Sequence, residues 1–194
     1  MTESIIVDNG RASDDAVVDP VLPSPNKHSP TGMHKELLGD DHKRLSSRLL
    51  QSRVGRDKQR YDGKTRLLAC IVAYRRRTNC DEFLLISSSK HPAQWILPKG
   101  GWETDESVVE SAMREADEEA GVAGDIVGSL GTLDFASQQG KPCRFYGFRL
   151  VATQVYEDWA ESTRQRKWVS IDEARKLLQY RPELVEMVER AAAL

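Results

Sequence analysis

The sequence predicts an α/β protein, a sandwich in which helices cover both faces of a central sheet. Short apolar runs of strand length alternate with amphipathic segments of helix length from about residue 64 onward. The first of these runs, LLACIVAY, is almost continuously apolar, which is typical of a central strand. The predicted strands are flanked by helices on both sides, and this order favours three layers.

The strands are predicted from apolar runs that lie between turn-forming residues. Those expected before the central helix are residues 66–75, 82–89 and 94–98. Those expected after it are residues 125–135, 141–156 and 167–171. The third strand runs into a loop formed by Lys99, Gly100 and Gly101. Two closing helices are expected at residues 171–178 and 182–194, the second with an apolar face of Leu184, Val185, Val188 and Ala191.

The central helix has recognisable start and stop signals. Thr104 or Asp105 can cap its start, because their side-chain oxygens can accept hydrogen bonds from free amide groups there. Gly121 is expected to end it, since glycine readily adopts the left-handed conformation found after a helix. Apolar residues recur at helical spacing and make one face of it: Val109, Ala112, Met113 and Ala116.

Three glutamates on this helix point to a metal site. Glu115, Glu118 and Glu119 stand at positions i, i+3 and i+4, so their side chains emerge on one side. Carboxylates this close repel one another unless a cation neutralises them, and Mg²⁺ or Mn²⁺, which prefer oxygen ligands, would do so. The alternative is a solvated helix with an acidic outer face. We disfavour it because other residues complete the pattern G-x5-E-x7-R-E-x-x-E-E-x-G-V. They are Gly100, Glu106, Arg114, Gly121 and Val122.

This pattern is identified as a Nudix box, which it matches at every fixed position. Nudix hydrolases cleave nucleoside diphosphates that are linked to another group, and related pyrophosphates. The resemblance therefore implies the Nudix form of the α/β/α sandwich, with a mixed sheet, and a metal-dependent hydrolase.

Segments outside the box resemble one branch of these enzymes, the diphosphoinositol polyphosphate phosphohydrolases, over about residues 60–185. They are YDG, SSSKHPAQWILPKGGWE, VYEDWAES, RKWVSIDEARKLLQY and Arg181-Pro182. This branch removes the β-phosphate from inositol pyrophosphates, and many members also split diadenosine polyphosphates. Lys99 stands where animal members usually have glycine, whereas plant and fungal relatives often carry PKGG, as here. Lys90 replaces an arginine, and both departures bear on substrate preference rather than on the reaction class.

The metal-binding and catalytic residues follow from the box. Glu115, Glu118 and Glu119 would hold Mg²⁺ (or Mn²⁺), helped by the backbone carbonyl of Gly100. Either Glu118 or Glu119 would act as the general base, and we favour Glu119. Arg114 would orient a helix glutamate through a charge-assisted hydrogen bond.

A compact polyanion requires a pocket lined with cations and hydroxyl groups. The positions that the resemblance assigns to substrate binding are Arg60, Lys64, Arg66, Ser88, Ser89, Lys90, Lys99, Gly100, Gly101, Arg164 and Arg181. Arg144, Arg166 and Lys167 are further candidates. The resemblance thus implies a highly anionic small molecule as the substrate.

Two other functions stay open. One is a different Nudix pyrophosphatase, acting on a dinucleoside polyphosphate, ADP-ribose or an mRNA cap, which would need aromatic side chains to clamp a base. The aromatic candidates are Trp102, Phe135, Phe145 and Tyr146, and we expect Trp102 to pack instead. The other is a non-catalytic module of the same fold that binds an anionic metabolite. Such a module would not require the complete set of box glutamates.

Residues 1–55 are expected to be a disordered tail and a basic linker, and residues 56–194 the Nudix domain. The basic stretch 42–60 could touch an anionic partner, although a solvated linker is favoured. A formal net charge of −2 implies neither a membrane nor an obligatory nucleic-acid partner, and no apolar run is long enough to span a bilayer. Without a recognisable secretory signal or metal-spaced cysteines, we expect the cytoplasm, or the nucleus.

Overall fold

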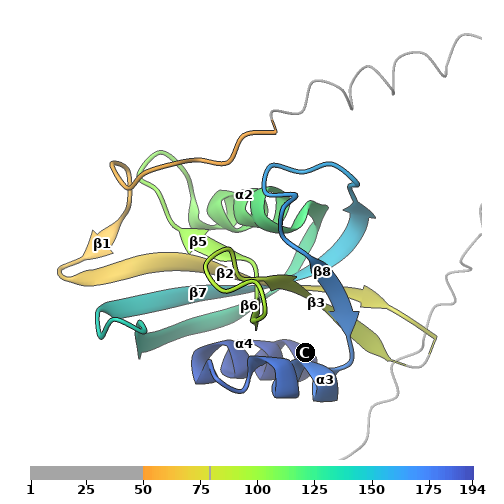
Figure 1. The fold of residues 1–194 in the computed structure, drawn as a ribbon. Helices are drawn as coiled ribbons and strands as arrows, with labels where there is room; N and C mark the ends of the chain where they lie inside the picture. The colour runs from red at the N-terminus through yellow and green to blue at the C-terminus, as the bar shows by residue number, and fades with distance from the viewer. Residues whose placement is uncertain (1–49, 79) are drawn as a thin grey trace, which may run out of the picture. The chain divides into compact units, whose positions relative to one another are not determined.

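The computed structural model describes residues 50–78 and 80–194, so most of the predicted tail and linker lies outside the described residues. The helices are α2 (Val108–Ala120), α3 (Ile171–Leu178) and α4 (Pro182–Ala192). One mixed sheet forms the middle layer, with α2 on one face and α3 and α4 on the other (Figure 1). The predicted three-layer α/β/α sandwich is confirmed.

Every strand expected from the sequence is present. The strands are β1 (Tyr61–Asp62), β2 (Thr65–Arg76), β3 (Asp81–Ser87), β4 (Trp95–Ile96), β5 (Lys99–Gly101), β6 (Val122–Ala136), β7 (Pro142–Val155) and β8 (Arg166–Val169). Strands β1 and β5 are additions to the prediction, and β4 is shorter than the run expected at 94–98.

Strand β2 is the axis of the sheet. Residues 69–73 are fully buried, because α2 covers one face of the strand and α4 contacts it from the other. One edge of β2 pairs in parallel with β7, and the other pairs antiparallel with β1, β5 and β3 in succession. Lys99, Gly100 and Gly101 were expected as a loop, but they fill the stretch of β2 edge between β1 and β3 as strand β5.

The order of strands across the sheet is β4-β3-β2-β7-β6, with β8 paired to β3. Strand β6 therefore forms an outer edge of the sheet. Its register against β7 shifts between residues 123 and 124, between 126 and 128, and between 129 and 131. Each shift is a bulge or irregularity of the kind that increases local twist.

Helix α2 begins later than expected, because its N-cap is Ser107 and neither Thr104 nor Asp105. The amide of Glu110 donates to Ser107 Oγ at 3.2 Å, and the amide of Ser107 donates to the Glu110 carboxylate at 2.7 Å. These two bonds form a capping box. As predicted, Gly121 ends the helix in the left-handed conformation, with φ of 59°.

The face that α2 buries consists mainly of alanine. Its fully buried apolar residues are Ala112, Ala116 and Ala120. Val109 and Met113, expected on this face, are 40 % and 45 % exposed, so the prediction is wrong for both. The helix is rotated so that Glu115 and Glu119 turn inwards instead, with exposures of 7 % and 8 %. Small alanine side chains let the helix lie close to β2 while those carboxylates point along the sheet.

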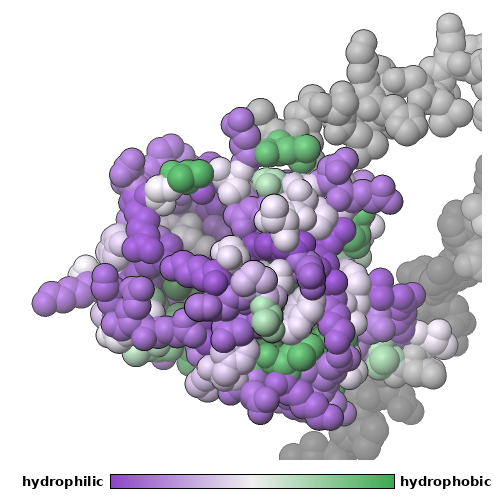
Figure 2. Space-filling view, viewed as in Figure 1, coloured by the Kyte–Doolittle hydropathy of each residue, from purple (hydrophilic) through white to green (hydrophobic). Residues whose placement is uncertain are grey.

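The opposite face of the sheet is covered by the two closing helices. Their fully buried residues are Ala174, Leu178, Leu184, Met187, Val188 and Ala191. Hydrophilic residues predominate on the molecular face in Figure 2, and hydrophobic ones appear there as small separate patches. None of the helices in the described residues is both long enough and apolar enough to cross a membrane.

Candidate active site

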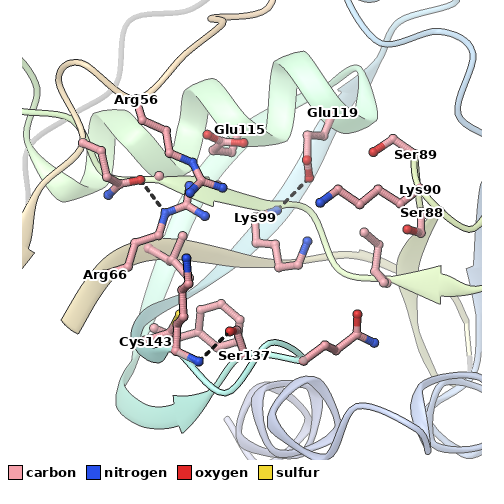
Figure 3. A pocket seen from close by; sticks show the side chains of 18 of the residues that line it. Arg56, Arg66, Ser88, Ser89, Lys90, Lys99, Glu115, Glu119, Ser137 and Cys143 are labelled. Carbon is pink, nitrogen blue, oxygen red and sulfur yellow. Dashed lines mark hydrogen bonds between the residues drawn. The ribbon is translucent and has the colours of Figure 1, made fainter. Parts of the chain in front are cut away.

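A pocket of about 580 Å³ lies beside α2 and is lined mainly from α2, β2, β5, β6, β7 and several loops. Figure 3 shows Glu115 and Glu119 of α2 along one side of it, with Arg66 and Lys99 on the strands across from them. Carboxylates and cations therefore face the same space, as binding of a metal and a phosphate chain would require.

Glu119 is held at both of its carboxylate oxygens. Oε1 accepts a hydrogen bond from Arg164 Nη2 at 2.7 Å, in an ion pair, and Oε2 accepts one from the backbone amide of Lys99 at 2.9 Å. Burial raises the pKa of Glu119 because the charged carboxylate loses hydration, although Lys99 and Arg164 act in the opposite direction. Strand β5 and the loop before β8 thus fix this side chain together.

Glu115 lies against the backbone of β5 at Gly100. A Cβ atom at residue 100 would stand 1.9 Å from Glu115 Oε1, so only glycine leaves room for the carboxylate. Burial raises the pKa of Glu115, and the neighbouring charge of Glu119 raises it further. The close approach of Glu115 therefore explains why the first position of the box is glycine, which the sequence pattern alone does not show.

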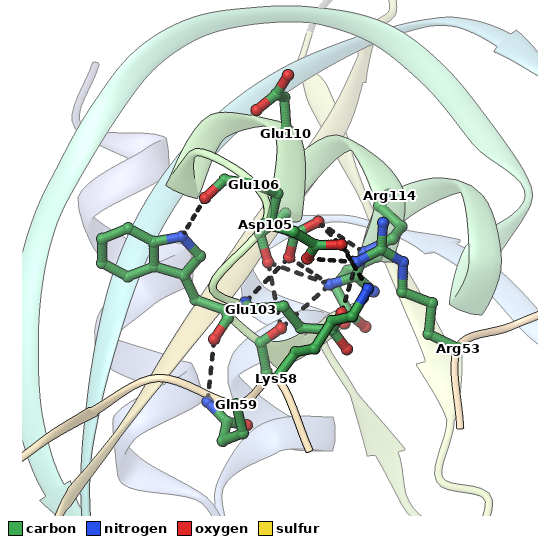
Figure 4. A network of polar contacts seen from close by, with 12 residues as sticks. Arg53, Lys58, Gln59, Glu103, Asp105, Glu106, Glu110 and Arg114 are labelled. Carbon is green, nitrogen blue, oxygen red and sulfur yellow. Dashed lines mark hydrogen bonds and ion pairs between the residues drawn. The ribbon is translucent and has the colours of Figure 1, made fainter. Parts of the chain in front are cut away.

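Arg114 is the centre of a network that holds the acidic residues (Figure 4). Its Nε and Nη2 donate to the two carboxylate oxygens of Glu106, at 2.9 and 2.7 Å. Its Nη1 donates to Glu115 at 2.8 Å and to Glu118 at 3.3 Å, and Nη2 also donates to the carbonyl oxygen of Gly101. A planar guanidinium suits such forked contacts. These are the contacts that the predicted orienting role of Arg114 requires.

The three glutamates predicted to hold a metal, Glu115, Glu118 and Glu119, do not converge on one point. Among residues 50–78 and 80–194, no group of three or more His, Cys, Asp or Glu side chains is placed to bind a metal ion. Arg114 and Arg164 explain this, because each guanidinium draws carboxylates towards itself.

The donor atoms nevertheless fit a divalent cation. They are carboxylate oxygens, the ligand type that Mg²⁺ and Mn²⁺ prefer. Burial raises the pKa of all three glutamates, which means that the arginines compensate their negative charge incompletely. That these carboxylates bind the ion together with a backbone carbonyl of β5 stays a prediction.

The pocket brings together most of the residues predicted to bind substrate. They are Lys64, Arg66, Ser88, Ser89, Lys90, Lys99, Gly100, Gly101, Arg164 and Arg181. Arg66 Nε donates to Gln59 Oε1 at 2.7 Å, which fixes the guanidinium in the lining. Burial lowers the pKa of Arg66, and the nearby charge of Arg56 lowers it further. An anionic ligand beside Arg66 would stabilise its buried positive charge.

Four other basic candidates lie outside the pocket lining: Arg60, Arg144, Arg166 and Lys167. Arg60 donates to two backbone carbonyl oxygens and lies 4.7 Å from the centre of the Trp102 ring. Arg144 forms ion pairs with two aspartates, Arg166 donates to three backbone carbonyl oxygens, and Lys167 pairs with a glutamate. Each is thus engaged in holding the fold, which the matching of sequence segments does not reveal.

Several lining residues are not among those predicted. They include Arg53, Arg56, Gln59, His91, Gln138, Lys141 and Glu161. The first three belong to the basic stretch 42–60, and the positive charge of that stretch is the sequence feature that could have predicted their place at an anionic site. Ser52 Oγ donates to Glu161 at 3.0 Å, and the amide of Arg53 donates to Glu118 at 3.3 Å. This part of the predicted linker therefore packs on the domain at the acidic side of the pocket.

The aromatic candidates for a base clamp are engaged in packing. Trp102 Nε1 donates to a carbonyl oxygen at 3.0 Å, and its ring meets Tyr146 edge-on with centroids 5.3 Å apart. Phe135 and Phe145 line the pocket but pack on each other, with centroids 4.3 Å apart. The structure agrees with the packing role expected for Trp102.

Comparison with known proteins places these features in context. Residues 64–191 match the NUDIX domain. Nudix hydrolase 4 of Arabidopsis thaliana is 42 % identical over 141 residues, which cover 67 % of this chain and 68 % of that protein. Diphosphoinositol polyphosphate phosphohydrolase 3-alpha of Mus musculus is 39 % identical over 133 residues, which cover 66 % of this chain and 79 % of that protein. A solved NUDIX hydrolase from Nitrosomonas europaea shares the fold, with a TM-score of 0.57 at 20 % identity over 67 % of this chain and 90 % of its own.

Proposed function

The chain belongs to the NUDIX family and is a Nudix hydrolase, and we propose that it removes the β-phosphate from diphosphoinositol polyphosphates, with diadenosine polyphosphates as second substrates. Family membership confirms the resemblance inferred from the box. Nudix hydrolases generally use a divalent metal, and we propose Mg²⁺ for this chain, with Mn²⁺ as a substitute.

One observation carries this proposal: cations line the pocket on both sides of the α2 carboxylates. Figure 3 shows Lys90 and Lys99 near Glu119, and Arg66 on the other side near Glu115. A substrate with a single diphosphate would need only one of these groups. An inositol ring with phosphates at many positions would contact both, because its charges point outward in several directions.

The residues of the acidic side have separate proposed roles. Glu115, Glu118 and Glu119 would hold the cation, which supplies charge neutralisation at the phosphate oxygens when bound. Arg114 orients Glu115 and Glu118 through hydrogen bonds, and Arg164 orients Glu119. Either Glu118 or Glu119 takes a proton from the attacking water on a carboxylate oxygen, and we retain Glu119.

The residues of the basic side would bind and position the substrate. Lys90 and Lys99, beside Glu119, would contact the reacting diphosphate (Figure 3). Ser88 and Ser89 add hydroxyl donors on the same side. Arg66 would contact a phosphate on another ring position. Fixing the ring in this way places the attacked phosphorus against the α2 carboxylates.

Phosphate release with Mg²⁺ tests the proposal. The substrates are an inositol pyrophosphate, diadenosine hexaphosphate, capped RNA and ADP-ribose, with Glu119→Gln as the control protein. We expect the fastest glutamate-dependent turnover on the inositol pyrophosphate. Preference for a nucleotide would make the chain a different Nudix pyrophosphatase. Binding without turnover of any substrate would indicate the non-catalytic module.

A further inference from the structure

One wall of the pocket comes from outside the matched NUDIX domain. Residues 52–59, here called the N-terminal strap, precede the matched range 64–191 and run on the α2 side of the sheet towards β1 (Figure 1). Arg53, Gly55, Arg56 and Gln59 of the strap line the pocket. The strap is therefore a part of this chain's site that family membership alone does not assign.

The strap is fastened at its first end by polar contacts with the domain. Ser52 Oγ donates to Glu161 at 3.0 Å, and Arg53 Nη1 donates to Asp105 at 3.1 Å. Lys58 Nζ donates to the same aspartate at 2.7 Å. Two basic side chains that flank the middle of the strap thus share one carboxylate, which limits how far that middle can move.

The second end is fixed by a buried glutamine. Gln59 is 9 % exposed, and its Nε2 donates to the carbonyl oxygens of Leu67 at 2.8 Å and Trp102 at 3.2 Å. Its Oε1 accepts the hydrogen bond from Arg66. The same side chain therefore joins the strap to β2 and aims the Arg66 guanidinium. Arg56 stands between these two anchored ends.

Arg56 faces the guanidinium of Arg66, and its repulsion there outweighs the attraction between Arg66 and the Glu115 carboxylate. Figure 3 shows the Arg56 and Arg66 side chains extending into the same part of the pocket, on the side opposite Ser88 and Lys90. Neither arginine has an ion pair with a described residue. Two positive charges that share a partly desolvated space repel each other, and an anion between them would turn that repulsion into attraction.

We propose that Arg56 of the N-terminal strap, together with Arg66, forms a phosphate subsite that determines specificity for substrates with several phosphates. This inference rests on the proposed function. The Lys90 and Lys99 side of the pocket takes the reacting diphosphate, and the Arg56 and Arg66 side takes a phosphate elsewhere on the same molecule. An arginine fork can hold such a phosphate through two parallel hydrogen bonds.

Calorimetric titration with inositol hexakisphosphate tests the subsite, because this polyanion has no phosphoanhydride to cleave. The titration uses the full chain in buffer without divalent cations. Arg56→Ala is expected to weaken binding by roughly tenfold to a hundredfold, the range for a lost hydrogen bond to a charged group. Arg56→Lys is expected to fall between wild type and Arg56→Ala, since lysine keeps the charge and loses the fork. Arg76→Ala, an exposed change at the far end of β2, is expected to bind like wild type.

Thermal unfolding of each variant controls for folding, and we expect no shift for Arg56→Ala because Arg56 is exposed. Equal binding by wild type and Arg56→Ala would overturn the subsite, and so would absence of binding by wild type. If binding depends on Arg56 while no inositol pyrophosphate is hydrolysed, the subsite stands and the proposed substrate is wrong. If inositol pyrophosphates are hydrolysed with an unchanged KM in Arg56→Ala, the proposed function stands and the subsite is wrong.

Discussion

Single residues decide how closely helix α2 and strand β5 can meet. Gly100 has no side chain, and Glu115 occupies the space that a Cβ atom would take. Glu118 pairs with Arg114, four residues earlier on the same helix, and Glu119 pairs with Arg164 from the loop before β8. The positions of the carboxylates thus depend on the missing side chain of Gly100 and on ion pairs with arginines, as well as on helical spacing.

Gly100→Ala is expected to lower kcat/KM by about 100-fold, because displacement of a reacting group by about 1 Å has an effect of that size. The added methyl group would collide with Glu115, which would have to move away from β5. Steady-state kinetics on the best substrate measures the loss. Gly128→Ala on β6 is the matched control, since its Cβ would meet only the flexible end of Leu194, at 3.0 Å. Equal activity of the two variants would contradict the steric argument.

Glu119→Gln is expected to lower kcat by at least about 100-fold, the lower bound for loss of a general base. Glutamine has nearly the same shape but only one acceptor oxygen, which can serve the Lys99 amide and not Arg164 as well. Arg164 keeps its ion pair with Glu161, so the fold is expected to persist. Turnover and circular dichroism measured on the same preparation check both statements. Wild-type turnover with wild-type metal dependence would leave Glu118 as the remaining candidate for the base.

The helices and strands show which parts of the fold local sequence patterns can predict and which they cannot. Continuous apolar runs located β2 and β3, whose residues are buried on both faces of the sheet, and helical periodicity located the two closing helices, each of which buries one face. Strand β5 was not recognised, since Lys99–Gly101 becomes a strand only where β2 offers it an unpaired edge. The start of α2 was misplaced because three residues able to cap a helix, Thr104, Asp105 and Ser107, follow one another closely. The capping preferences of these residue types are too similar to show which of them is the N-cap.

Ser107→Ala is expected to lower the free energy of unfolding by about 1 kcal/mol, the usual effect of losing a helix N-cap. The hydroxyl accepts from the Glu110 amide, and alanine leaves that amide without its partner. Urea denaturation measures the difference. Ser107→Asp is expected to retain most of the stability, because aspartate also caps well. A loss as large for aspartate as for alanine would mean that the cap is not the cause.

At the scale of the whole molecule, the pocket is assembled from segments that lie far apart in sequence. The box residues and most of the basic lining could be predicted, since they lie in segments that resemble known enzymes. The contacts of Ser52 with Glu161 and of Arg53 with Glu118 could not, because composition assigns the strap to a solvated linker. The converse holds for Arg60, which matched a family position but donates to backbone carbonyl oxygens outside the pocket.

Divalent cations are expected to stabilise the whole fold, because they would compensate carboxylates that burial has stripped of water. At Mg²⁺ concentrations 100-fold above the dissociation constant, the free energy of unfolding should rise by about 2.7 kcal/mol. Thermal unfolding with Mg²⁺ and with excess EDTA measures the change, and EDTA is also expected to abolish turnover. Glu115→Gln is expected to lose most of the stabilisation. The same Mg²⁺ effect in that variant would place the ion elsewhere.

The irregular register of β6 has a consequence for the molecule at high concentration. A straight outer strand presents a row of free backbone groups on which another chain can add, and this is a common route to aggregation. Along β6 the shifts near Gly124, Gly128 and Gly131 break that row and twist it. At the other margin β8, which pairs with the edge of β3 away from β2, has only four residues and offers little surface for pairing. Both margins of the sheet are thus poor templates for intermolecular pairing.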